Sequence, residues 1–194
     1  MTLAERWLEE ALATPGITGL RDLDAARRVL LDDALLAVPV VEASSGGIVD
    51  VGSGGGSPGI PIAIALPSRD VTLLEAERRK CRFLERFAAE LPNLSVVWGR
   101  AEEQPVERYG VALAKALAKP PVAVELCLPL VRTGGVAVVW VGETADTDAA
   151  AAAAAQLGGT LERAGDGLLV LRKVAPTPPG FPRRPGMAKK RPLA

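Results

Sequence analysis

Residues 50–61 read D-V-G-S-G-G-G-S-P-G-I-P, and this glycine-rich segment constrains the fold more than any other part of the chain. An apolar run containing Asp50 precedes it, and a second apolar run from Ile60 to Leu66 follows it. Glycines between a strand and a helix let the backbone approach a ligand more closely than side chains permit. The segment therefore predicts a strand, a nucleotide-binding turn and a helix. A glycine-rich turn without a ligand is the alternative.

The spacing of the glycines indicates which nucleotide the turn binds. Dinucleotide folds favour G-x-G-x-x-G, but Ser57 occupies the third glycine position of that pattern. Gly52, Gly54 and Gly56 instead give G-x-G-x-G, which resembles the first motif of class I methyltransferases that bind S-adenosylmethionine (SAM). Glu75 ends the next apolar run, where a carboxylate can accept both hydrogen bonds of a ribose diol. That acid by itself does not separate SAM from NAD.

Short apolar runs alternate with helical segments from Ile48 onward, which is typical of a parallel sheet with helices on both faces. We expect strands near residues 47–52, 70–75, 94–98, 109–115 and 135–141, and helices near 58–66, 77–91, 120–132 and 146–157. Two closing runs, 159–164 and 167–174, flank a Gly-Asp-Gly turn that favours an antiparallel hairpin. The predicted fold class is α/β: a Rossmann-like, mostly parallel seven-stranded sheet of the class I SAM-dependent methyltransferase type.

Length and charge suggest three parts of the chain. We expect a short N-terminal helical extension at residues 1–45 with helices near 2–13 and 21–37, a SAM-binding domain at 46–174, and a basic, proline-rich tail at 175–194. No acidic residue follows Asp166, whereas seven Lys and Arg residues do; because the formal net charge is zero, residues 1–166 carry −7. A cationic tail on an acidic body suggests a polyanionic partner, and a solvated, disordered terminus is the alternative.

Composition excludes several kinds of chemistry. Histidine is absent, which excludes a histidine general base, nucleophile pairs that use histidine, and histidine-containing metal sites, and we expect no metal. The cysteines, Cys81 and Cys127, are expected to be free thiols among apolar neighbours. No apolar stretch is long enough to span a bilayer, and the first residues lack the order of a secretory signal. We therefore expect a cytoplasmic protein without a membrane partner.

Three motifs in order carry a more specific resemblance. The glycine segment with its S-P-G-I-P extension, the later G-R-A-E-E at residues 99–103, and the tail F-P-R-R-P-G-M-A-K-K-R-P-L at 181–193 together resemble the RsmG family (glucose-inhibited division protein B). The resemblance runs from about Leu30 to the C-terminus. It implies SAM as cofactor, methyl transfer to N7 of a guanine in bacterial 16S ribosomal RNA, and 16S rRNA or the small ribosomal subunit as partner. We expect the protein to be a monomer.

The resemblance also implies site residues. The cofactor-binding candidates are Gly52, Gly54, Ser57, Glu75, Ala101, Glu102 and Lys115. The catalytic candidates are Lys115 and Arg100. Glu75 would hold the ribose, and Ala101 and Glu102 would border the adenine. Lys115, Arg100 and the tail would bind RNA phosphates. We therefore expect that deleting residues 176–194 weakens RNA binding and leaves SAM affinity nearly intact.

Departures from the family pattern keep other interpretations open. The usual S-R-A is Ala114-Lys115-Ala116 here, the F-D before it is Tyr109-Gly110, and a lysine expected in the fifth strand is Val141. Ser57 also replaces a bulky apolar residue. Lysine lacks the bidentate fork of arginine. One alternative is a SAM-binding protein that recognises rRNA with lost or altered methyltransferase activity; another is an NAD-linked oxidoreductase, which Ser57 and the missing base disfavour.

Overall fold

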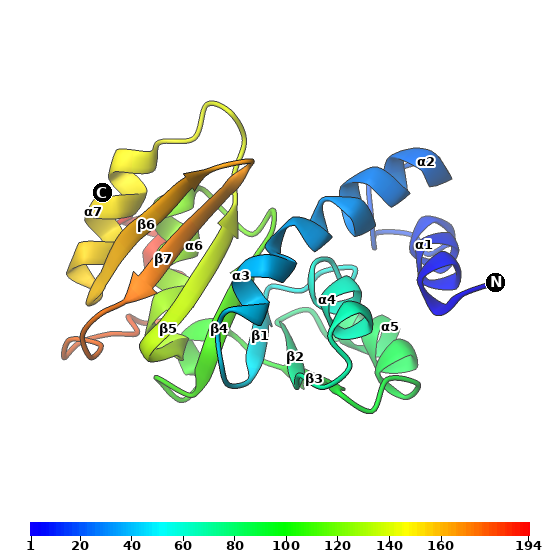
Figure 1. Cartoon of the computed structure of the whole chain (residues 1–194), viewed down its shortest axis with the longest axis horizontal. Coiled ribbons are helices and arrows are strands. Elements are labelled where there is room, and N and C mark those ends of the chain that lie inside the picture. The colour runs from blue at the N-terminus through cyan, green and yellow to red at the C-terminus, as the bar shows by residue number, and fades with distance from the viewer.

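The computed structural model describes all 194 residues, and its centre is one seven-stranded sheet in the order β3-β2-β1-β4-β5-β7-β6 (Figure 1). The strands are β1 (Ile48–Val51), β2 (Val71–Glu75), β3 (Leu94–Trp98), β4 (Tyr109–Ala114), β5 (Val131–Trp140), β6 (Gly159–Gly165) and β7 (Leu168–Lys173). Strands β1 to β5 are parallel, whereas β7 runs antiparallel to both β5 and β6. The predicted α/β class, the mostly parallel seven-stranded sheet and the C-terminal hairpin are confirmed.

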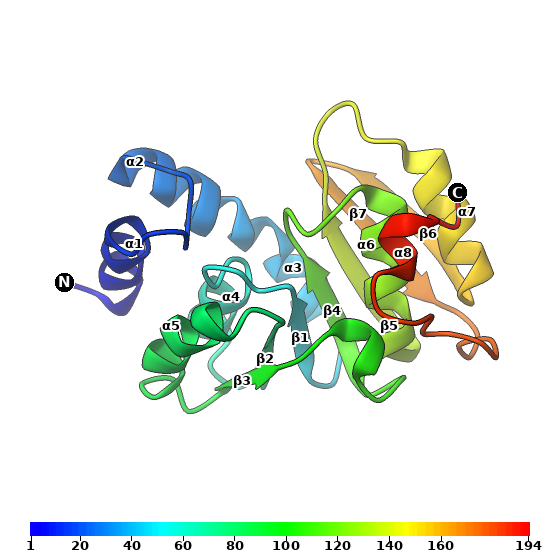
Figure 2. The same cartoon turned by 180° about the vertical axis from the view of Figure 1, so that it is seen from behind.

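Helices cover both faces of the sheet (Figures 1 and 2). They are α1 (Leu3–Ala13), α2 (Leu23–Ala26), α3 (Val38–Glu42), α4 (Gly59–Ala65), α5 (Arg78–Ala88), α6 (Pro120–Cys127), α7 (Thr147–Gln156) and α8 (Met187–Lys190). None of these helices combines the length and the apolar character that crossing a membrane requires.

Two apolar clusters lie on opposite faces of the sheet because neighbouring strand residues point in opposite directions. Ile48 packs with α1, α4 and α5, whereas the adjacent Val49 packs with α6 and α7. Both side chains are fully buried. Burial on two faces explains why the strands are continuous apolar runs instead of alternating apolar and polar residues.

Two predicted helices differ from the observed ones. The segment near 21–37 is not one α-helix: α2 is followed by a π-helical turn at Arg27–Asp32, a 3-10 turn at Ala34–Ala37 and then α3. The helix predicted near 120–132 ends at Cys127, and β5 begins at Val131. A proline disrupts helix interiors, and Pro129 lies in the short 3-10 turn between them. Because both elements are apolar, hydrophobicity alone did not locate this boundary.

The N-terminal helix α1 docks on α5 through polar contacts around an apolar centre. Arg86 pairs with Glu10, and Arg6 pairs with Glu90. Trp7 is fully buried between these contacts. Arg86, on the basic side of α5, therefore contacts α1 while its side chain stays about half exposed.

Candidate functional site

A cavity of about 580 Å³ opens where the carboxyl ends of β1, β2, β3 and β4 meet. The chain leaves β1 toward β2 on one side and reaches β4 on the other, so this is the switch point where open α/β sheets bind ligands. All eight residues predicted for the site line this single cavity: Gly52, Gly54, Ser57, Glu75, Arg100, Ala101, Glu102 and Lys115.

The glycine turn forms the floor of the cavity in a backbone conformation that other residues rarely adopt. Gly52, Gly54 and Gly56 have φ angles of +71°, +55° and +104°. A β-carbon added to Gly52 would lie 2.4 Å from Cδ1 of Leu117, which also lines the cavity. Glycine is thus required at Gly52 both for the backbone angle and for space.

Most amides of the turn hold the turn itself. The carbonyl of Leu74 accepts hydrogen bonds from the N–H groups of Gly52 and Ser53, at 2.8 and 3.2 Å. In contrast, the N–H groups of Gly55 and Ser57 donate no hydrogen bond within the chain. These two amides are therefore the backbone donors that remain available to a ligand.

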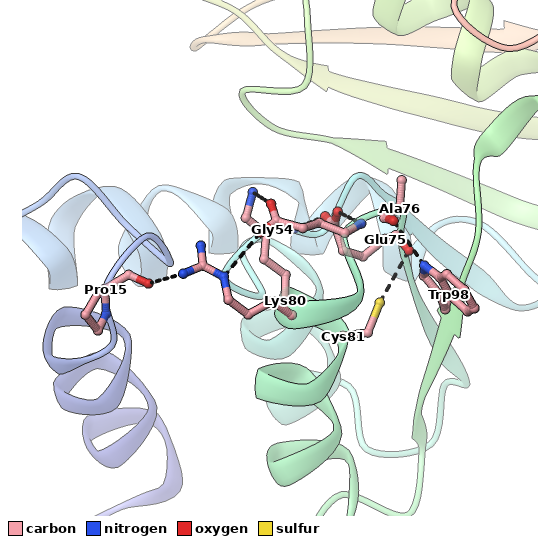
Figure 3. A network of polar contacts seen from close by, with 9 residues as sticks. Pro15, Gly54, Glu75, Ala76, Lys80, Cys81 and Trp98 are labelled. Atoms are coloured by element: carbon pink, nitrogen blue, oxygen red, sulfur yellow. Dashed lines mark hydrogen bonds and ion pairs between the residues drawn. The ribbon is translucent and has the colours of Figure 1, made fainter.

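Glu75 joins the end of β2 to the glycine turn. Its Oε2 accepts a hydrogen bond from the N–H of Gly54 at 2.8 Å, and its Oε1 accepts one from the N–H of Glu77 at 2.7 Å, as the polar contacts around Glu75 in Figure 3 illustrate. The residue is only 7% exposed. Each carboxylate oxygen can accept a further hydrogen bond, so the two oxygens retain capacity for a diol.

Asp50 lies beneath the turn and outside the cavity lining. Its Oδ2 accepts a hydrogen bond from the N–H of Gly59 at 3.0 Å, while its Oδ1 has no partner. Burial raises the pKa of Asp50 to about 7. This carboxyl therefore fastens the start of α4 to the end of β1 and does not contact a ligand in the cavity.

Lys115 closes the β4 side of the cavity through contacts with the N-terminal segment. Its Nζ donates to the carbonyl of Val29 at 2.7 Å and lies 2.9 Å from Oδ2 of Asp33. The side chain is 10% exposed. The sequence placed Lys115 at the site but gave no indication of these two partners.

The π-helical turn supplies further carbonyl acceptors to the same region. Ser57 Oγ donates to the carbonyl of Leu30 at 2.8 Å, and Trp140 Nε1 donates to that of Asp33 at 3.1 Å. A π-turn interrupts the usual helical hydrogen-bond ladder, and such turns are common at functional sites. The segment Arg27–Asp33 is thereby bound to the glycine turn, to β4 and to β5.

Residues after β3 form the opposite rim. Ala101 and Glu102 lie in a 3-10 turn, Ala101 is buried, and the side chain of the preceding Arg100 is exposed at the cavity. Glu102 Oε1 accepts a hydrogen bond from the N–H of Gly186 at 2.9 Å. The tail therefore reaches the rim of the cavity.

Several residues that line the cavity or support its glycine turn were not predicted, because they come from both termini. Trp7 Nε1 donates to the carbonyl of Gly55 at 2.7 Å, and Ile17 lines the cavity beside the turn. Gly186, Ala188 and Lys189 of the tail line the cavity too. The expectation that deleting residues 176–194 leaves SAM affinity nearly intact did not include this wall, and it stays a prediction. No cluster of three or more side chains that could ligate a metal ion is present.

Comparison with known proteins identifies relatives of the whole chain. Residues 6–161 match the family model GidB, described as rRNA small subunit methyltransferase G. A ribosomal RNA small subunit methyltransferase G from Pelotomaculum thermopropionicum is 37% identical over 205 residues, covering 95% of this chain and 84% of that protein.

Solved structures show the same fold. A 16S rRNA methyltransferase (RsmC) from T. thermophilus in complex with AdoMet and guanosine superposes with a TM-score of 0.51 at 19% identity, over 70% of this chain and 37% of that one. A predicted O-methyltransferase from Agrobacterium tumefaciens gives a TM-score of 0.57 at 18% identity, over 72% and 78%. The predicted class I SAM-dependent methyltransferase fold is confirmed.

Proposed function

This chain belongs to the GidB family, the rRNA small subunit methyltransferases G, and from that premise we propose that it transfers the methyl group of SAM to N7 of a guanine in 16S ribosomal RNA. The observation that carries the proposal is the convergence, on one cavity, of all the residues that the family resemblance implied. The antiparallel β7 argues against the NAD-linked oxidoreductase, because dehydrogenase sheets usually lack such a hairpin.

The cavity suits SAM in size and in the chemistry of its walls. Its volume of about 580 Å³ falls within the range of small-molecule sites. Glu75 would accept hydrogen bonds from the ribose hydroxyls, and the free N–H groups of Gly55 and Ser57 would donate to polar groups of the cofactor. Ala101 and Glu102 would border the adenine. When bound, SAM supplies an electrophilic methyl group on a sulfonium centre.

Methylation at N7 needs no base from the protein. Neutral guanine carries a lone pair and no proton at N7, so that atom can attack a methyl group directly. An exocyclic amine or a hydroxyl would have to lose a proton, and enzymes usually recruit a base for that step. The chain has no histidine to serve as one. Its contribution would be to align acceptor and donor, an effect worth about 7–11 kcal/mol in favourable cases.

Cationic residues around the cavity would hold the RNA backbone. Arg100 is exposed at the rim, and Lys189 of the tail lies on the lining as well. Phosphate contacts of this kind position a nucleic acid and carry little sequence information. Lys115 would join them as a point charge once it separates from Asp33. The partner would be 16S rRNA or the small subunit. We propose that the protein acts in the cytoplasm as a monomer.

A methyl-transfer assay tests the proposal. Purified protein is incubated with tritiated SAM and small ribosomal subunits that lack the modification, and the rRNA is digested to nucleosides. We expect label to co-elute with N7-methylguanosine. Label in another nucleoside would refute the N7 assignment. Measured SAM and rRNA binding without any transfer would instead favour the SAM-binding rRNA-recognition protein with lost or altered activity.

A further inference from the structure

The tail folds back onto the domain and ends against the cavity. Ala188 of α8 is 2% exposed, and Phe181 and Leu193 pack on the apolar cluster formed by α6 and α7. Figure 2 shows α8 lying against α6. These contacts make residues 181–193 an ordered part of the protein surface.

One ion pair anchors this segment. Arg183 Nε donates to Oε1 of Glu125 at 2.6 Å, and its terminal Nη2 donates to Oε2 of the same carboxylate and to the carbonyl of Arg191 at 2.8 Å. The side chain of Glu125, on α6, is only 3% exposed. Hydrogen bonding to Glu125 raises the pKa of Arg183. A guanidinium that binds both oxygens of a buried carboxylate fixes orientation as well as distance.

The anchor lies three residues before the contact with the cavity rim. Gly186 has a φ of +79° and donates its N–H to Glu102 Oε1, on the side of the cavity where the adenine is proposed to bind. Gly186, Ala188 and Lys189 line the cavity directly. A shift of the segment at Arg183 would therefore move a wall of the cavity and release Glu102.

We propose that Gly186, Ala188 and Lys189 form a wall of the cofactor cavity and that Arg183, held by Glu125, is a positioning residue for cofactor binding. This inference rests on SAM being the ligand of the cavity. Because the ordered tail forms part of the ligand site, ordering of the tail raises the affinity for the ligand. Binding of the ligand then shifts the tail toward its ordered state by the same factor.

Hydrogen exchange on the intact protein measures that reciprocity without any substitution. We expect saturating SAM to slow amide exchange in the glycine turn at residues 52–57 and also in residues 183–190. Protection of the turn with unchanged exchange in the tail would overturn the inference and leave the proposed SAM site in place. Protection in neither segment would refute the SAM site itself, so the two failures are distinguishable.

A substitution at the anchor gives the affinity readout. Arg183→Met should weaken SAM binding by at least about tenfold in calorimetry. The dissociation constant for S-adenosylhomocysteine should rise in parallel. Arg184→Met is the neighbouring control, since Arg184 is exposed and forms no ion pair. Arg172→Met removes a different ion pair, with Glu162, outside the cavity. Both controls should bind SAM like the parent. Parental affinity in a folded Arg183→Met protein would overturn the inference.

Discussion

The ammonium group of Lys115 lies 2.9 Å from the carboxylate of Asp33, and this pair joins the end of β4 to the N-terminal segment that covers the cavity. The same lysine is the residue that would contact an RNA phosphate. In this structure, the charge of Lys115 is paired with Asp33, so in the proposed function one charge would both hold the N-terminal segment and bind the substrate.

Opposite substitutions in this pair separate the two roles. Lys115→Met should lower methyl transfer by about tenfold or more, because it removes a phosphate contact. Asp33→Asn should raise RNA affinity, because the lysine is no longer paired, while costing up to about 1 kcal/mol of stability as partly exposed pairs do. The methyl-transfer assay measures the first effect. Filter binding of RNA and thermal unfolding measure the RNA affinity and the stability. If Lys115 served only to hold the N-terminal segment, both variants would lose RNA affinity together.

Gly52 provides a test of the turn. Gly52→Ala should cost about 1–2 kcal/mol of stability because its φ is positive, and should weaken SAM binding because the new methyl group crowds Leu117. Gly134→Ala is a matched control, since Gly134 has a φ of +86° and nothing within 4 Å of the added carbon. It should lose similar stability and keep its SAM affinity. Equal SAM affinity in both variants, measured by calorimetry, would contradict the role of Gly52.

Asp50 makes stability depend on pH. Its folded-state pKa of about 7 exceeds the ordinary value of 3.8, so between these values the folded state binds more protons than the unfolded state. The free energy of unfolding then falls as pH rises through this window, by at most about 1.4 kcal/mol per pH unit from this group. Asp50→Asn mimics the protonated form and should lack that fall.

The measurement compares denaturant unfolding of the Asp50→Asn variant and the parent at about pH 5 and about pH 8. The variant should gain stability relative to the parent as pH rises. Asp70→Asn, at an exposed carboxyl, is the control for removing a surface charge. A constant difference between Asp50→Asn and the parent would show that Asp50 is not protonated preferentially in the folded state.

Trp7 tests the support of the turn by α1. Trp7→Phe keeps an aromatic ring but removes the hydrogen bond to Gly55, and should cost about 1–3 kcal/mol of stability. SAM affinity should fall with it, because the turn loses its contact on the N-terminal side. Trp140→Phe also removes an indole hydrogen bond, to Asp33, but outside the cavity lining, and should bind SAM like the parent. Unchanged affinity in Trp7→Phe would exclude this support.

The sequence was sufficient to predict the sheet and the convergence of the candidate residues on one cavity, for a physical reason. Side chains that follow parallel strands meet at one edge, so Gly52, Glu75 and Lys115 had to converge once the strands were located. What it did not predict are contacts between segments distant along the chain. Trp7 reaches Gly55 across 48 residues, and Gly186 reaches Glu102 across 84. Hydrophobic periodicity carries only local information, so it predicts a helix near residues 2–13 but not the contact of Trp7 with the turn.

The cavity takes one part of its lining from Ala11 and another from Lys189. During synthesis, Ala11 is made before all the strands of the sheet and Lys189 after all of them. The wall that Lys189 completes is therefore the last part of the cavity to be synthesised.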